Sequence, residues 1–327
     1  MRSALWLIAA ALPLAAQPKL LINAQVQNHS AAAGLESQFK TLLTAQPQPA
    51  WIGYSVPSTR AYNLGCDYVR DGYSQPGVIH LEAPDHAVIL YRIESNQVNR
   101  IRTLSPDCEI DAGGVPVHWL TDVQPAQSVA LLVSMMTQRE RTGESPLNAI
   151  AQHADPSADQ AIEQFLATNQ PQSVRLRAVS ALGSARGKHG FDVLKKLIAN
   201  DPDERIRERA ISGLSSSKEP EAFDLLISIA KADSSARMRE QAISSLAHKT
   251  NPAVIPTLSK IIESDPDVQV KKRAVQSLNQ VPDGGGIPVL IQTIKNTPNG
   301  EVRKQAMNTL QQSRDPRAVA FFEQVLK

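Results

Sequence analysis

Three histidines and one aspartate in the N-terminal half could together ligate a metal ion. His80, Asp85, His86 and His118 all lie in a stretch that reads as β-structure, and imidazole nitrogens and carboxylate oxygens are ordinary zinc ligands. A lone histidine on a strand, however, more often lies at the surface or makes a simple hydrogen bond. We therefore expect no bound metal and no cofactor, and we keep a metal site here as the alternative.

Signatures of common catalytic sites are missing from the sequence. It has no Gly-x-Ser-x-Gly nucleophile turn, no His-Glu-x-x-His motif and no Gly-rich phosphate loop, and we interpret Gly284-Gly285-Gly286 as a loose turn. The sequence therefore favours a chain that is not an enzyme. The alternative is an enzyme or metal-binding module in residues 17–122, with the rest of the chain as its recognition arm.

Cys66 and Cys108 are the only cysteines in the chain. Their spacing fits neither a CxxC redox motif nor a zinc site, whereas an oxidising compartment would allow them to pair. We predict a disulfide, with a typical stabilisation of about 2–4 kcal/mol. Two free thiols that never meet are the alternative, because the sequence does not give the distance between them.

The first residues are typical of a signal peptide. Arg2 precedes an apolar run, Ala4 to Leu14, and small residues follow as far as Ala16. We predict cleavage after Ala16 and therefore an exported protein, periplasmic or secreted; a buried N-terminal helix is the alternative. The run is too short to span a bilayer, which takes about 20 helical residues, so we expect no membrane span.

Cations recur at a fixed interval in the C-terminal half, where a line of them could follow nucleic-acid phosphates. They are Arg175, Arg207, Arg239, Lys271 and Arg303, spaced at intervals of 32 residues. Each stands three residues before an alanine, and a leucine follows that alanine by four residues. This apolar spacing predicts one face of an amphipathic helix, which we name the B helix of the repeat.

A second apolar stretch follows each B helix and predicts an A helix. Prolines at several of its starts suit a first helical turn, and Asp201-Pro202-Asp203 and Asp265-Pro266-Asp267 predict a tight turn from the A helix to the next B helix. Each antiparallel pair leaves apolar surface that only a neighbouring pair can cover. We therefore predict a mainly α fold, a right-handed α-solenoid over residues 145–327.

These residues resemble a known family, the short HEAT-like repeats of bacterial proteins, including those of phycobilisome lyases. The resemblance covers residues 155–327. It implies that the turn aspartates and the cations form a structural ladder, in which the cations bridge the turns of neighbouring repeats. The ladder residues are Asp201, Arg207, Asp233, Arg239, Asp265 and Lys271. A structural ladder argues against nucleic acid as the partner. Phycobilin lyase activity is disfavoured by export, and the His-Glu pairs that ligate iron in some HEAT-like enzymes do not occur in this sequence.

Both ends of the array depart from the repeat. Residues 145–152 look like a degraded B helix, and Pro316 to Lys327 form an A helix with no B helix after it. The apolar surface of that last helix is a candidate for self-association. Before the array, residues 17–122 alternate in the manner of strands with one amphipathic helix, which predicts a small α+β domain, and residues 123–144 predict a linking helix.

The remaining exposed side of the B helices carries the candidate binding residues. They lie five residues and one residue before the repeated alanines: Arg177, Arg205, Arg209, Arg237, Gln241, Gln269, Arg273 and Gln305. Stacked helices would present them as a concave polar stripe, moderately basic at its centre. With a net charge of only +2 overall, we predict a scaffold that binds another protein through an acidic or extended segment. A merely solvated face is the alternative.

Overall fold

The computed structural model describes residues 20–59, 66, 68–70, 73–75, 85–136 and 146–325. The predicted signal peptide, His80 and residues 137–144 of the predicted linking helix lie outside these residues. By compactness the chain divides into two units, one ending at Gln164 and one beginning at Phe165. The boundaries expected from the sequence at residues 122 and 144 stay a prediction. No helix in the described ranges is long and apolar enough to cross a membrane.

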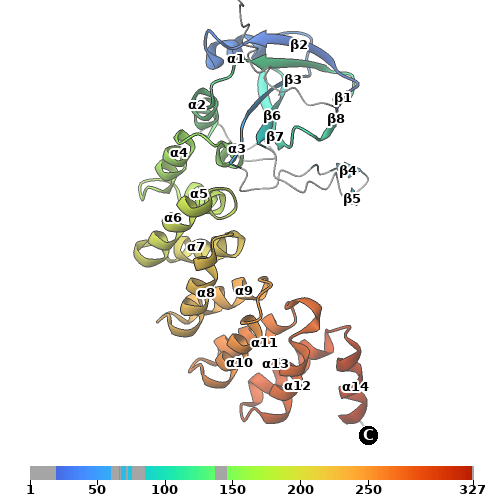
Figure 1. Cartoon of the computed structure of the whole chain (residues 1–327), viewed down its shortest axis with the longest axis vertical. Helices are drawn as coiled ribbons and strands as arrows, with labels where there is room; N and C mark the ends of the chain where they lie inside the picture. Colours follow the sequence, from blue (N-terminus) through green and yellow to red (C-terminus); the bar gives the residue numbers. More distant parts are fainter. Residues whose placement is uncertain are drawn as a thin grey trace, which may run out of the picture. The chain divides into compact units, whose positions relative to one another are not determined.

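A mixed five-stranded sheet forms the centre of the first unit (Figure 1). Its order is β2 (Gln25–Ser30), β9 (Pro116–Thr121), β3 (Ala50–Pro57), β6 (His86–Glu94) and β7 (Gln97–Leu104). The first three strands run parallel, whereas β6 and β7 pair antiparallel. Two short pairs accompany the sheet: β1 (Leu20–Ile22) with β8 (Glu109–Asp111), and β4 (Tyr68–Arg70) with β5 (Tyr73–Gln75).

Helices and sheet together make the small α+β arrangement that the sequence predicts. The helices of this unit are α1 (Leu35–Leu43), α2 (Pro125–Met135) and α3 (Pro146–Gln152). Side chains alternate along β3, so Ile52, Tyr54 and Val56 point to one face and are fully buried. Phe39 of α1 meets Tyr91 of β6 edge to face at 5.0 Å, which ties the helix layer to that face.

The opposite face of the sheet carries a smaller apolar cluster of Val88, Leu90 and Trp119. Gly53 makes their close packing possible, because a β-carbon there would lie 2.5 Å from the Leu90 side chain and 3.0 Å from the Trp119 ring. Beside this cluster, Cys66 and Cys108 form a disulfide with Cα atoms 5.3 Å apart, which confirms the predicted pairing.

Paired helices make up the rest of the chain (Figure 1). The B helices are α5 (Gln172–Ala185), α7 (Glu204–Ser216), α9 (Ala236–Ala247), α11 (Val268–Leu278) and α13 (Gly300–Gln311). The A helices are α4 (Ser157–Leu166), α6 (Gly187–Asn200), α8 (Pro220–Ala232), α10 (Val254–Ser264), α12 (Ile287–Asn296) and α14 (Pro316–Val325). The predicted loose turn is a short 3₁₀ turn, Pro282–Gly284, that ends with Gly284 at a φ of 63°.

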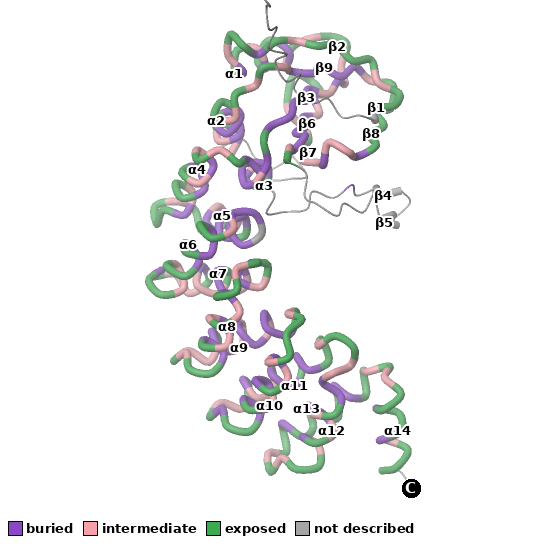
Figure 2. Tube along the Cα trace, in the orientation of Figure 1, coloured by how far each residue is buried: buried purple, intermediate pink, exposed green. Residues whose placement is uncertain are grey.

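The repeated alanines and leucines form the core of this array. Figure 2 shows buried stretches along its helices. All five alanines, from Ala178 to Ala306, are fully buried, and the leucines four residues later are at most 1% exposed. Small residues allow the helices to approach closely: a β-carbon on Gly183 of α5 would clash with the carbonyl group of Gly213 of α7 and lie 2.8 Å from its Cα.

Side-chain caps begin most of the B helices. Asp203, Ser235, Asp267 and Asn299 each accept hydrogen bonds from backbone N–H groups in the first turn of the helix that follows. These N–H groups have no partner within the helix, so each cap typically contributes about 1 kcal/mol. The tight turns thereby fix where each B helix starts, and with it the register of the face that it exposes.

Candidate functional site

The B helices form the inner layer of the array. Each packs directly and extensively on the B helices before and after it, whereas neighbouring A helices touch each other much less. Because successive B helices are packed more closely than successive A helices, the B helices lie on the concave side wherever the array curves. The exposed positions of the B helices therefore lie next to one another from repeat to repeat.

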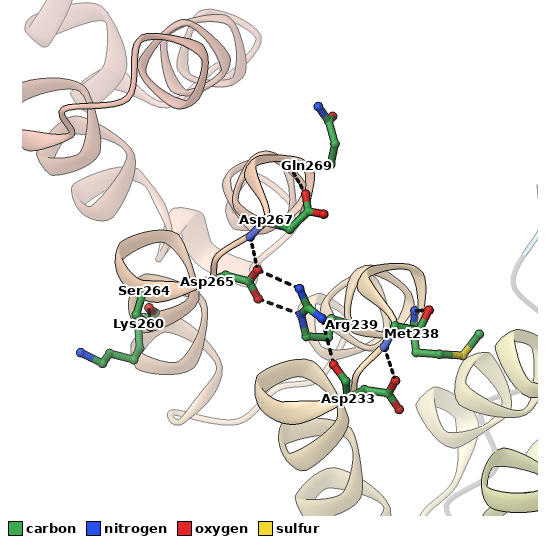
Figure 3. A network of polar contacts seen from close by, with 9 residues as sticks. Asp233, Met238, Arg239, Lys260, Ser264, Asp265, Asp267 and Gln269 are labelled. Carbon is green, nitrogen blue, oxygen red and sulfur yellow. Dashed lines mark hydrogen bonds and ion pairs between the residues drawn. The ribbon is translucent and has the colours of Figure 1, made fainter.

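Arg239 joins two repeats through both of its neighbouring turns (Figure 3). Its guanidinium donates two hydrogen bonds to the carboxylate of Asp265 in the next turn, at 2.9 and 3.0 Å, and one to the backbone carbonyl of Asp233 in its own turn, at 2.9 Å. The bond to Asp265 raises the pKa of this buried arginine. Asp265 also accepts from the N–H of Asp267 at 2.8 Å, so its carboxylate holds the turn as well as the neighbouring repeat.

The other cations of the column occupy similar positions. Arg175 pairs with the carboxylate of Asp201 in the next turn, and its Nε donates to the carbonyl of Leu166 at 2.8 Å. Arg207 donates to the backbone carbonyl of Asp201 at 2.7 Å, and Lys271 donates to that of Glu263 at 3.0 Å. Arg303 donates to the carbonyl of Thr297. Because these cations are engaged with the turns, they offer no open line of charge to a phosphate backbone.

Several residues of the predicted stripe contact the adjacent repeat. Arg237 pairs with Glu208 on the preceding B helix, with Nη2 and Oε2 3.1 Å apart, and Arg273 approaches Glu240 to 3.8 Å. Gln241 donates to the hydroxyl of Ser212 at 2.9 Å. Arg205 likewise reaches back across the joint between repeats, to the side chain of Gln172 at 3.3 Å. Reasoning from the sequence missed these acidic neighbours.

Two exposed side chains of the stripe remain open. In the part of the chain that the structure describes, Arg209 and Gln269 make no side-chain hydrogen bond or ion pair, and both are exposed. Arg177 and Gln305 bond within their own helices, to the carbonyl of Ser173 at 3.3 Å and the hydroxyl of Thr309 at 3.2 Å. The face is therefore less basic than its arginines suggest, with Arg209 as its open cation.

The two described histidines of the predicted metal set, His86 and His118, do not meet. Pro57 pairs with His86 on one side of β3 and Ile52 pairs with His118 on the other, so these histidines lie five residues, or roughly 16 Å, apart along the strand direction and on opposite sides of β3. His86 contacts Asp85 at 2.9 Å, and His118 contacts His29 at 3.1 Å. The described residues hold no group of three or more His, Cys, Asp or Glu side chains placed to bind a metal.

A buried chain of hydroxyl and imidazole groups lies between the sheet and its helices. The Tyr54 hydroxyl bonds to that of Tyr91 at 2.6 Å and to that of Ser128 at 2.8 Å, and Ser128 bonds to His153 Nε2 at 2.8 Å. His153 Nδ1 faces the carbonyl of Ala149, an acceptor only, so Nδ1 carries the proton and Nε2 accepts from Ser128. Burial raises the pKa of Tyr54 to about 12.

The bond between Ser128 and His153 has the distance expected of a nucleophile and its general base. All four side chains of the chain are fully buried, however, so no substrate can reach the hydroxyl. We assign this series of hydrogen-bonded side chains a structural role, because it joins β3, β6, α2 and α3. The sequence carries no signal for it, since its members are scattered over about a hundred residues and none belongs to a recognisable motif.

Comparison with known families decides the identity of the repeats. The family model of HEAT repeats matches residues 159–247 and 255–327. The C-terminal half of the chain belongs to the HEAT-repeat family. This confirms the resemblance drawn from the 32-residue period, and the matched segments extend over the paired helices described above.

Solved structures similar to this HEAT-repeat protein come from different organisms. Escherichia coli YibA is 23% identical, with 55% of this chain and 67% of that chain covered and a TM-score of 0.37. The complex of CpcE and CpcF of phycocyanin lyase from Nostoc sp. PCC7120 is 18% identical, with 46% and 97% covered and a TM-score of 0.36. Human deoxyhypusine hydroxylase is 14% identical, with 61% and 76% covered and a TM-score of 0.31. No curated protein matches the chain.

Proposed function

We propose that the HEAT repeats are a non-enzymatic scaffold that binds another protein through the exposed face of the B helices. The observation that carries this proposal is the continuity of that face. Its polar side chains recur at the same register on successive helices that pack directly on one another, and Arg209 near its centre is open. An extended segment with a few carboxylates matches such a row of donors.

The ion pairs already present on this face are compatible with binding. The side chains of Arg237 and Arg273 are 60% and 46% exposed in their pairs with Glu208 and Glu240. Because the arginines are well exposed while Glu208 and Glu240 are only 18% and 28% exposed, a carboxylate of the partner can approach the arginines from solvent while the internal acids stay in place. The internal acids also disfavour binding to a dense polyanion, which supports a protein partner over nucleic acid.

Binding partners can be captured by crosslinking and pulldown with the full chain from its native fraction. Replacing Arg209 and Arg273 together with glutamate should abolish capture, because two donors become like charges to an acidic segment. Lys231→Glu with Lys260→Glu is the matched control, since it makes the same charge change on the exposed side of A helices α8 and α10. Equal capture by both double variants would refute the assignment of the face.

We further propose that the protein works outside the cytoplasm, periplasmic or secreted. The disulfide between Cys66 and Cys108 supports an oxidising compartment, where such bonds persist. Fractionation of the native host followed by N-terminal sequencing tests the proposal. A mature chain that starts at Gln17 in the exported fraction is the expected result, and an intact Met1 in the cytoplasm would contradict it.

Self-association through the last helix is also part of the proposal. In α14, Ala318 and Phe321 are buried, whereas Val319 and Val325 are 54% and 59% exposed. Among the described residues no B helix follows α14. Sedimentation velocity should show a concentration-dependent dimer that Val319→Glu abolishes, and a monomer at all concentrations would remove this part of the proposal.

A further inference from the structure

A cavity in the first unit lies against the sheet face opposite the helices. It encloses about 200 Å³. Trp51, Leu90 and Val117 of three neighbouring strands form its floor, and Leu104 and Ile110 add further apolar wall. The disulfide between Cys66 and Cys108 also lines it, so the position of that wall is fixed covalently.

Strand register brings two arginines together at one side of this cavity. Across the sheet, Val117 pairs with Trp51, Trp51 with Arg92, and Arg92 with Arg100. Directly paired residues on antiparallel strands have β-carbons about 4.5–5.5 Å apart, and like charges at that distance destabilise each other. Arg100 lines the cavity itself, and Arg92 lies over the Trp51 ring of its floor, 5.6 Å from the ring centre.

Neither cation of this pair is neutralised within the described part of the chain. No carboxylate there forms an ion pair with Arg92 or Arg100. Two carboxylates and a third arginine also line the cavity: Glu109, Asp111 and Arg102. The carboxylate of Asp111 accepts from the N–H of Gly113 at 2.8 Å and from the side chain of Asn23 at 3.2 Å, and the cations of the cavity outnumber its two acids once Arg92 beside it is counted. Arg100 is exposed, so its guanidinium is accessible to a bound anion.

We propose that this cavity binds a small carboxylate with an apolar body. The carboxylate would accept hydrogen bonds from Arg100 and lie near Arg92, and so relieve the repulsion between the two cations. Its body would rest on Trp51 and Leu90. A cavity of about 150 Å³ holds benzene, so this one has room for a body of roughly eight to ten non-hydrogen atoms. The proposal is independent of partner binding by the repeats.

Octanoate and 3-phenylpropionate are suitable probes, with octanol and octylamine as neutral and cationic counterparts of the first. Binding to the full chain is measured by isothermal titration calorimetry and by tryptophan fluorescence, to which Trp51 in the floor and Trp119 in the adjacent cluster contribute. We expect at least one of the two carboxylates to bind about tenfold more tightly than octanol, because a charge-assisted bond to arginine is added. Octylamine should bind more weakly than octanol.

Variants separate the two halves of the site. Arg100→Gln should bring the affinity for the carboxylate down to that for octanol, whereas Lys40→Gln, which removes an exposed cation from α1 on the helix side of the sheet, should change nothing. Trp51→Leu should weaken the carboxylate and octanol alike. A preference for phenylpropionate or for octanoate identifies an aryl or an acyl ligand. Equal affinities for octanoate, phenylpropionate and octanol, or unchanged carboxylate binding in Arg100→Gln, would overturn the proposal.

Discussion

Replacing Asp265 with alanine should destabilise the joint between two repeats more than any surface change. Arg239 would lose both carboxylate bonds, at 2.9 and 3.0 Å, while its guanidinium stays buried. Breaking a buried pair by removing one partner typically costs about 3–5 kcal/mol, because the remaining charge is uncompensated. The bond from Arg239 to the carbonyl of Asp233 survives, but the N–H of Asp267 also loses its acceptor, so we expect a loss within this range, about 3–5 kcal/mol.

Urea unfolding followed by circular dichroism at 222 nm measures the loss of stability. Repeat arrays can unfold locally, so amide hydrogen exchange in α9 and α11 should locate the effect at this joint. Arg239→Met combined with Asp265→Ala should recover about 2 kcal/mol, since no buried charge is left. Lys260→Met, at an ion pair with Glu263 whose side chains are 68% and 63% exposed, should cost at most about 1 kcal/mol. A double variant as unstable as Asp265→Ala alone would refute the reasoning.

Three further predictions concern packing, buried polar groups and pH. Gly183→Ala should destabilise the array by about 1–3 kcal/mol in urea unfolding, because its β-carbon meets the backbone of the facing glycine, whereas Gly300→Ala has open space and should not destabilise it. Ser128→Ala should lower the free energy of unfolding by about 1–3 kcal/mol in urea unfolding followed by near-UV circular dichroism, because buried His153 loses its hydrogen-bond donor. An unchanged urea midpoint would contradict the buried hydrogen bond between Ser128 and His153. Burial lowers the pKa of His118. The unfolded chain therefore binds the proton more tightly, so stability should be full above about pH 6.5 and fall as the pH drops below it, a slope that His118→Gln should reduce.

The repeats could be predicted from the sequence because their signal is local and periodic. The alanine and leucine positions recur every 32 residues without insertion, from Ala178 to Ala306. This constant register identifies the buried face of each B helix from the sequence alone. Turn residues such as Asp203 have a cap role that depends only on the next few residues. The disulfide could be predicted as well, because the chain offers only one possible pair.

Contacts between repeats were harder to foresee. The family resemblance predicted that the cations bridge the turns of neighbouring repeats, as Arg239 does. The motif spacing, however, matched Asp265 with Lys271, whereas its carboxylate pairs with Arg239 of the preceding repeat. Glu208 and Glu240 share one register position, two residues before the alanine, and this was a readable signal that the stripe would be partly neutralised. The chain from Tyr54 to His153 depends on the tertiary packing of distant segments, which no local pattern reports.

The ladder also bears on how the array can change in length. Two joints use the same pair of register positions, an arginine in one B helix and an aspartate in the turn 26 residues later: Arg175 with Asp201 and Arg239 with Asp265. Removal of residues 203–234, one 32-residue period, would leave both of these pairs intact and bring α9 into the place of α7. Gene duplication or loss can therefore lengthen or shorten the array by whole 32-residue modules while these arginine–aspartate pairs persist, although the facing surfaces of the newly joined helices, such as that of Gly183 against Gly213, must adapt.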